Sequence, residues 1–357
     1  MDIRVKKTAE LTAVEWSAWD EIQGSSRVYE SPYFRPHFAQ AVAAVRSDAE
    51  VAVLSENGQV VGFFPFQRGP LNLGKPIGGK LSDYHGPLLA PGASVDPRAL
   101  LAACKLASWD FDHFVSTTPA LEPFIRERGK SPQMDLSEGF DAYARRRREA
   151  GSEVIQKQGQ KTRKLSREVG PLRFELDARD DESYDLLRKW KSAQYIATGM
   201  GDVFSFPWTL ELISKLRHHT GEDFAAPLTV LRAGEKIAAL CLCLRSRDVL
   251  HGWFTAYNPE LHNYSSGISL FIRLAEEAEQ LGIRKFDMGR GDEPYKWRLA
   301  STSIEVGEGS VTTRSLATLL RAGWRQTRDW AAKSPLKGTA ALSSRLLKPI
   351  REWVAYG

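Results

Sequence analysis

Residues 228–244, LTVLRAGEKIAALCLCL, decide the predicted fold of the second half of the chain. Two runs of apolar and β-branched residues flank Ala233 and Gly234, and the glycine supplies the positive φ that a tight hairpin turn requires. A third strand is predicted at 249–257, a helix at 268–281 and a short strand at 283–288. The predicted order is therefore β-β-β-α-β, followed by a turn and another helix.

The first half of the chain repeats this pattern. Residues 51–67, VAVLSENGQVVGFFPFQ, form a second predicted hairpin whose turn is Asn57-Gly58. Predicted helices precede both hairpins, at 32–46 and 210–217. The fold class is therefore α/β (α+β), with two similar domains, each a mixed and mostly antiparallel sheet flanked by helices, joined by a charged helix.

Length and composition agree with two soluble globular domains. The chain has 357 residues, of which 42 % are hydrophobic and 26 % charged, which excludes disordered and fibrous classes. We expect an N-terminal domain at 1–140, a basic linker helix at 141–170, a C-terminal domain at 171–310 and a basic helical tail at 311–357.

The net charge of +5 is concentrated in two segments. Residues 145–167 carry nine basic side chains, and residues 314–351 carry nine more. Both segments are candidates for contact with a polyanion, and the tail also for contact with a membrane surface or a partner protein. The simpler alternative is that the first is a solvated helix and the second a loosely packed tail.

Three cysteines, Cys104, Cys241 and Cys243, are too few and too widely spaced for a disulfide framework or a zinc site, so no metal is expected. No run of about 18 apolar residues predicts a transmembrane helix, and the amino terminus lacks the apolar region of a signal peptide. These features favour a cytoplasmic protein.

The most informative motif is DMGRGDEPYKWR at 287–298, which follows the short strand. Together with KSAQYIATGMGDVF at 191–204 and GGKLSDYHGP at 78–87, it resembles the CelD-like acetyltransferases, a group named for cellulose biosynthesis proteins. The β-β-β-α-β order resembles the GNAT acyltransferase fold that this group shares. The resemblance covers roughly residues 30–310 and implies transfer of an acetyl or other acyl group from acyl-CoA.

In such a fold, backbone N–H groups of the strand before the main helix hold the thioester carbonyl, here residues 253–257. The pyrophosphate of coenzyme A lies on the next turn and helix amino terminus, where unpaired N–H groups favour an anion. The resemblance places this site at Ser265, Ser266 and Gly267, although the usual glycine-rich pattern is reduced to one glycine. An ordinary serine-capped helix is the alternative.

The two glycines of the motif allow a sharp turn that brings Tyr295 and Lys296 back toward the site. The resemblance implies Tyr295 as the general acid for the departing thiolate, and Asp287 joins it as a catalytic candidate. Lys296 is predicted to bind donor phosphate or an acidic acceptor. Asp292 and Glu293 are predicted to brace the turn or to receive the acceptor proton, unless the segment is merely a charged turn.

The remaining candidates lie outside this motif. Asp83 and His85, in a loop bounded by glycine and proline, are candidate bases for an acceptor hydroxyl or amine, or members of a polar surface loop. Residues of a predicted helix end and of the loop after it are candidates for recognising the acceptor by hydrogen bonds: Lys191, Gln194, Tyr195 and Asp202.

The preferred hypothesis is an acyltransferase (EC 2.3.1.-) acting on a hydroxyl or amine, on a sugar or polysaccharide precursor by analogy. A second hypothesis comes from the Fem-type peptidyltransferases, which duplicate the same fold and use aminoacyl-tRNA; the basic segment 145–167 would then hold RNA. A third is a non-catalytic scaffold in an envelope-polysaccharide complex.

Overall fold

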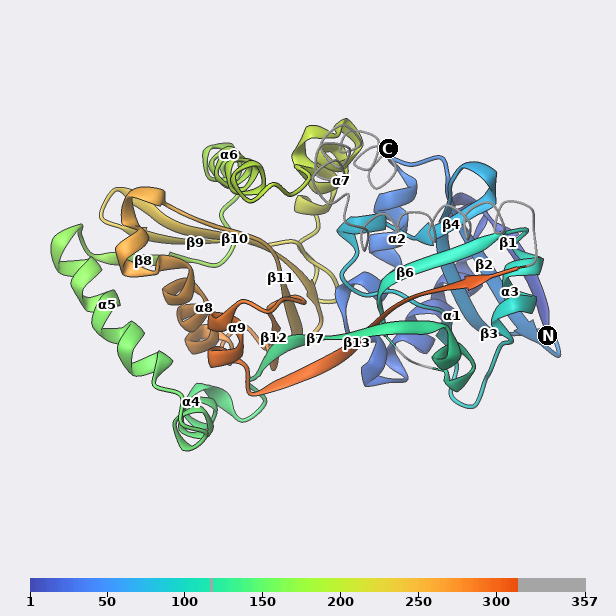
Figure 1. Ribbon diagram of the computed structural model, residues 1–357, viewed down its shortest axis with the longest axis horizontal. Coiled ribbons are helices and arrows are strands. Elements are labelled where there is room, and N and C mark those ends of the chain that lie inside the picture. The colour runs from blue at the N-terminus through green and yellow to red at the C-terminus, as the bar shows by residue number, and fades with distance from the viewer. Residues whose placement is uncertain (116–117, 314–357) are drawn as a thin grey trace, which may run out of the picture. The chain divides into compact units, whose positions relative to one another are not determined.

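The computed structural model describes residues 1–115 and 118–313, so the predicted tail lies outside the described residues from position 314 on. The chain forms two compact units. Among the described residues, unit 1 contains Met1–Tyr29, Ala39–Arg128 and 306–313, and unit 2 contains Glu30–Phe38 and Gly129–Glu305. Each unit is a mixed, mostly antiparallel sheet flanked by helices, as the sequence predicts (Figure 1).

Unit 1 is built on the predicted first hairpin. Its elements are β1 (Asp2–Lys6), α1 (Ala13–Gly24), the end of α2 (Pro36–Ala43), β2 (Ala49–Glu56), β3 (Gln59–Arg68), β4 (Leu73–Pro76), β5 (Leu88–Leu89), α3 (Pro97–Ala103), β6 (Ser108–Phe114), the start of β7 (Ile125–Asp135) and the end of β13 (Thr302–Thr312). The strand order is β1-β2-β3-β4-β6-β13, and β5 pairs with β3. The pair β4 and β6 is parallel, and the other pairs are antiparallel.

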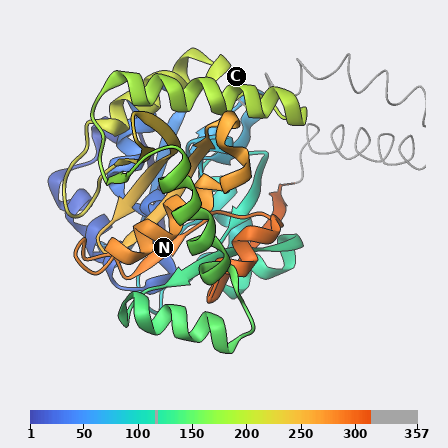
Figure 2. The same ribbon diagram turned by 90° about the vertical axis from the view of Figure 1, so that its left-hand side faces the viewer.

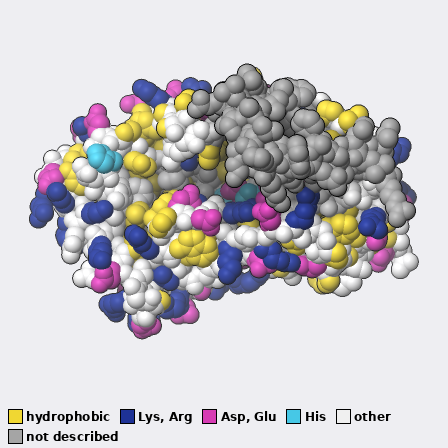
Figure 3. All heavy atoms as spheres, viewed as in Figure 1, with side chains coloured by type: hydrophobic (Ala, Val, Ile, Leu, Met, Phe, Trp, Pro, Cys, Tyr) yellow, Lys and Arg dark blue, Asp and Glu magenta, His cyan; other side chains and the backbone are white. Residues whose placement is uncertain are grey.

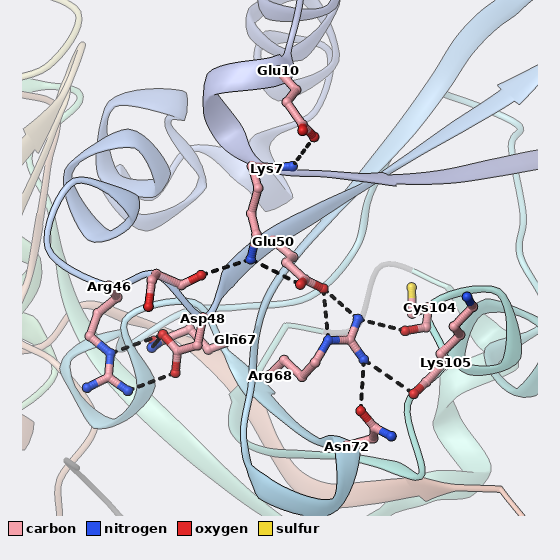
Figure 4. Close-up of polar contacts among 11 residues, drawn as sticks. Lys7, Glu10, Arg46, Asp48, Glu50, Gln67, Arg68, Asn72, Cys104 and Lys105 are labelled. Carbon is pink, nitrogen blue, oxygen red and sulfur yellow. Dashed lines mark hydrogen bonds and ion pairs between the residues drawn. The ribbon is translucent and has the colours of Figure 1, made fainter.

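The first hairpin has the turn that its sequence predicts. Asn57 and Gly58 lie between β2 and β3 with φ of 52° and 79°, the left-handed values of a tight hairpin turn. A polar network then ties the hairpin to α3 (Figure 4). Arg68 on β3 donates to the carboxylate of Glu50 on β2 and to the carbonyl of Cys104 at the end of α3, over 3.1 and 2.9 Å. The guanidinium therefore places a positive charge at the carboxyl end of α3, where it interacts favourably with the helix dipole.

Unit 2 is built on the predicted second hairpin. Its elements are the start of α2, the end of β7, α4 (Gly139–Glu149), α5 (Val154–Glu168), β8 (Leu172–Glu175), α6 (Asp181–Thr198), α7 (Pro207–Arg217), β9 (Leu228–Ala233), β10 (Lys236–Ser246), β11 (Val249–Tyr257), α8 (Ser266–Glu277), β12 (Lys285–Asp287), α9 (Pro294–Leu299) and the start of β13. The strand order is β7-β12-β11-β10-β9-β8, and the pair β11 and β12 is parallel. The predicted order β-β-β-α-β, turn, helix is confirmed.

Helices cover both faces of the sheet of unit 2, with α6 on one face and α8 and α9 on the other (Figure 1). The core between the sheet and α8 contains Phe271, Ala275 and Ala278, which recur at helical spacing. Cys241 and Cys243 lie in this core as free, buried thiols.

Segment 141–170 forms two helices where the sequence predicted one. Gly151, with φ of 79°, follows the end of α4, and α5 begins at Val154. Both helices bury side chains in the core of unit 2, Tyr143 from α4 and Leu165 from α5. This basic segment is therefore part of unit 2. Among the described residues, no helix is both long and apolar enough to cross a membrane.

Candidate active site

In unit 2, strand β12 pairs with only part of β11. This strand pairs with β12 only from Val249 opposite Lys285 to His251 opposite Asp287. On that side, no strand among the described residues pairs with 252–257, although the other edge of β11 continues along β10. Beyond His251 and Asp287 the two strands diverge, and a strand edge of this kind can bind an extended ligand by backbone hydrogen bonds.

Asp287 lies at the point where the strands diverge, with 2 % of its surface exposed. Its carboxylate accepts hydrogen bonds from Ser131 and Gln133 on β7, at 2.9 and 2.7 Å, and from the N–H of Gly289 at 2.9 Å. The Nδ1 atom of His251, which is fully buried, lies 3.5 Å from the same carboxylate. These contacts favour an anchoring role for Asp287 over the catalytic role that the sequence suggested.

The predicted cofactor residues form the amino terminus of α8. Ser265 has a left-handed φ of 53°, and its carbonyl accepts from the N–H groups of Ile268 and Ser269. The N–H groups of Ser266 and Gly267 have no acceptor among the described residues, and the buried hydroxyl of Ser266 has no partner there either. A Cβ added at Gly267 would meet nothing within 4 Å, so space is open beside these donors.

Helix α5 completes this end of the site and lies beside α8 (Figure 2). The amide of Gln158 donates to the carbonyls of Tyr264 and Ser265, at 2.8 and 3.2 Å, and fixes the turn before α8. The Nζ atom of Lys161 donates to the Ser265 hydroxyl at 2.9 Å. A positive charge and unpaired N–H groups therefore meet at one helix amino terminus, an arrangement that suits a phosphate.

Tyr295 lies in the first turn of α9. Its ring packs against the core of unit 2, with its centroid 6.3 Å from that of Phe271. Burial raises the pKa of Tyr295, so its phenol stays protonated at neutral pH. No hydrogen bond to its hydroxyl occurs among the described residues, and the proton therefore remains available to a ligand.

Lys296, the next residue, faces the protein and not an open surface. Only 8 % of the residue is exposed, and its Nζ atom lies 3.3 Å from the carbonyl oxygens of Gly289 and Arg290 and from Oε2 of Glu293. Glu293 and Asp292 themselves are exposed. These contacts occupy Lys296 within the turn, and no phosphate is needed to explain them.

The candidate acceptor residues on α6 divide into two groups. Lys191 donates to the Gln194 side chain at 3.1 Å and lies 5.0 Å from the ring centroid of Tyr195, so these three side chains form one cluster. Burial lowers the pKa of Lys191. Asp202 lies outside this cluster, where it accepts from the N–H of Phe204 and caps a short 3-10 helix.

Asp83 and His85 lie in unit 1. The Nε2 atom of His85 accepts hydrogen bonds from the N–H groups of Asp112 and His113, at 3.2 and 3.1 Å. Burial lowers the pKa of His85 to about 3, so the ring is neutral at physiological pH. A neutral ring whose acceptor nitrogen already binds two amides is poorly suited to act as a base, which favours a structural role.

The segment around His85 also completes the strand pairing in the sheet of unit 1. Strands β4 and β6 pair only from Leu73 to Gly74 and then diverge, as β11 and β12 do in unit 2. Here the backbone of His85 forms a bridge with β6 opposite Phe114, and β5 then pairs with β3. Residues 85–89 therefore fill the opening in unit 1 with the chain's own backbone.

Sequence reasoning missed several residues of the site. Gln158 and Lys161 were part of a charged run that gave no sign of which side chains face α8. Ser131 and Gln133 lie more than 150 positions before Asp287, and nothing local links them to it. Only His251 carried a signal, because a histidine inside an otherwise apolar predicted strand is a buried polar group that needs a partner.

Comparison with known proteins shows that much of unit 2 resembles a known protein family. Residues 154–297, less than half of the chain, match the model of a family described as an acetyltransferase (GNAT) domain. This segment includes the diverging strands, α8 and Tyr295. A search of curated proteins finds no match to the chain.

Two solved structures resemble the chain over nearly its whole length. The C-terminal domain (DUF2156) of a putative lysylphosphatidylglycerol synthetase from Agrobacterium fabrum is 14 % identical, with a TM-score of 0.51 over 88 % of this chain and 95 % of that one. FemX is 11 % identical, with a TM-score of 0.57 over 90 % of this chain and 99 % of FemX. At these identities the likeness shows the fold alone, a GNAT-type acyltransferase fold.

Proposed function

We propose that the protein transfers an acetyl or other acyl group from acyl-CoA to a hydroxyl or amine, and that the reaction takes place in unit 2. The observation that carries this proposal is that, among the described residues, no strand pairs with 252–257 of β11 on the side where β12 pairs with Val249–His251. The amide-containing arm of coenzyme A can pair with such an edge, as a peptide does in strand addition. Its pyrophosphate would then rest on the amino terminus of α8, beside Lys161.

The proposed chemistry is a direct transfer. The acceptor oxygen or nitrogen attacks the thioester carbonyl carbon, and backbone N–H groups of β11 stabilise the oxyanion. The carbon–sulfur bond breaks, and the departing thiolate takes the proton of the Tyr295 hydroxyl. The acceptor proton passes to Glu293 or to solvent, and reprotonation of Tyr295 completes the cycle.

For the acceptor we propose a sugar or polysaccharide precursor in the cytoplasm, as in the CelD-like acetyltransferases. The motif at 287–298 supports this family, and Lys191, Gln194 and Tyr195 offer hydrogen bonds and an aromatic face to a polyhydroxylated ligand. Near α9, hydrophobic and acidic side chains gather on the surface of unit 2 (Figure 3).

A second candidate is a transferase that uses aminoacyl-tRNA, in the manner of the Fem-type enzymes. Helix α5 favours it, because its exposed residues include Lys161, Arg163 and Arg167, and Lys161 donates to Ser265 at the amino terminus of α8. Such a row of cations would bind RNA with a strong dependence on salt concentration.

One set of binding measurements separates the candidates. We expect acetyl-CoA or a longer acyl-CoA at a hundred times its dissociation constant to stabilise the protein by about 2.7 kcal/mol in thermal unfolding. Transfer of labelled acetyl groups to a panel of amino sugars and oligosaccharides then tests the acceptor. Stabilisation by aminoacyl-tRNA alone, lost at high salt, would replace the first candidate with the second. No stabilisation by either donor would favour a non-catalytic scaffold.

A further inference from the structure

The motif 287–298 contains a buried lysine, Lys296, to which the proposed acyl transfer assigns no role. An ammonium group has three N–H bonds and no capacity to accept. Around Nζ of Lys296 there are three acceptors at 3.3 Å, the carbonyl oxygens of Gly289 and Arg290 and the carboxylate of Glu293. The donors of the buried ammonium are therefore matched by groups of the turn itself.

Two further side chains, Asp287 and Trp297, also hold this turn by hydrogen bonds. The backbone N–H of Gly289 donates to the Asp287 carboxylate, and the carbonyl of Gly289 accepts from the Lys296 ammonium. Two side chains of opposite charge therefore fix both backbone polar groups of Gly289. The indole of Trp297 donates to the carbonyl of Gly291 at 3.2 Å. Three successive carbonyls, from 289 to 291, therefore point toward α9.

The two glycines fit this arrangement. Gly289 has a left-handed φ of 73°, which favours glycine. A Cβ added at Gly291 would lie 2.0 Å from Oε2 of Glu293 and 2.8 Å from Nζ of Lys296. The backbone approaches the ion pair so closely at this position that a side chain would displace it.

We propose that Lys296 is a positioning residue, whose ammonium closes the turn 289–293 onto α9 and thereby fixes Tyr295 at the site. Tyr295 precedes Lys296 directly, and the first turn of α9 begins at Pro294, so the path of the turn sets where the phenol lies. This inference rests on the proposed role of Tyr295 as the proton donor. It is an alternative to the expectation that Lys296 binds donor phosphate.

The first test needs no activity. Hydrogen exchange of the backbone amides in 288–297 is measured for the wild type, for Lys296→Met and for Lys189→Met, which changes an exposed lysine of α6. We expect exchange in this segment to rise at least tenfold in Lys296→Met alone. Unchanged protection would overturn the inference, whatever reaction the protein catalyses.

The second test distinguishes positioning from phosphate binding. We expect Lys296→Met to lower kcat by tenfold or more while the dissociation constant of free coenzyme A changes less than threefold, and Lys296→Arg to restore part of kcat. A tenfold weaker binding of coenzyme A with an intact turn would instead make Lys296 a donor ligand. If Lys296→Met failed to fold, Lys296→Arg and Lys296→Gln would be measured in its place.

A double variant tests whether Lys296 acts through Tyr295. In the Tyr295→Phe background, Lys296→Met should lower kcat by no more than about threefold further, because the proton donor is already absent. Losses that multiply in full would show that the lysine acts independently and would refute the proposal. If no acyl transfer is found with any donor, the proposed function fails, and the exchange measurement still decides whether the turn depends on Lys296.

Discussion

Replacing Tyr295 by phenylalanine removes one oxygen atom and tests the proposed mechanism directly. A positioned general acid contributes roughly 10² to 10⁴-fold to a rate, which corresponds to about 2.7 to 5.4 kcal/mol of the activation barrier. The ring stays, and with it the contact with Phe271. Because the hydroxyl has no hydrogen bond among the described residues, we expect the free energy of unfolding to change by less than about 1 kcal/mol.

The pH dependence gives an independent check on Tyr295. Burial raises its pKa, so the phenol should stay protonated up to and beyond the ordinary tyrosine value of about 10. We therefore expect that Tyr295 causes no alkaline loss of kcat below that pH. The shape of the pH profile of kcat should then be the same in the wild type and in Tyr295→Phe. Steady-state kinetics from pH 6 to 10 and thermal unfolding of both proteins measure this. A kcat within threefold of the wild type would remove Tyr295 from the mechanism.

Three further predictions concern the donor site and unit 1. Titration calorimetry with coenzyme A should give one site per chain, because residues 85–89 close the opening in unit 1; two sites would show that this segment moves aside. Gly267→Asp should raise the dissociation constant of coenzyme A at least tenfold with the fold intact, since the added carboxylate would lie in open space at the proposed phosphate position, while Gly267→Ala should change it little. Burial alone would raise the pKa of Glu50, but hydrogen bonds from Arg68 and Lys7 outweigh it and lower that pKa. The resulting stability is present above the ordinary value of about 4.3 and is lost as the pH falls through the lowered one, so Glu50→Gln should reduce the melting temperature at pH 7 and flatten its decline in acid.

The features that the sequence predicted well depend on local signals. The turn Asn57-Gly58 and the β-branched runs beside it are sufficient to define a hairpin, and strand β11 was predicted with its observed bounds, Val249–Tyr257. Helix α8 followed from apolar residues at helical spacing. These elements together give the order of strands and helices from which the GNAT fold was inferred.

The features that sequence reasoning missed depend on contacts between distant segments. Lys296 looks like an exposed basic residue because its burial comes from carbonyl groups of the preceding turn, and carbonyl groups leave no mark in a sequence. His85 looked like a candidate base because its loop is polar, yet its partners are backbone amides of β6. The break between α4 and α5 did have a local signal, Gly151, but the basic residues on both sides made the segment look continuous.

Unit 1 is completed by a segment that follows unit 2 in the sequence, and this affects folding during synthesis. Strand β6 of unit 1 pairs with residues 307–312 of β13, which leave the ribosome almost 200 residues later. Until then β6 keeps an unpaired edge, which is the kind of surface that promotes aggregation during synthesis. Cutting the gene between residues 128 and 129 would likewise leave the first fragment without this strand. We expect such halves to be insoluble when produced separately and to recover solubility when produced together.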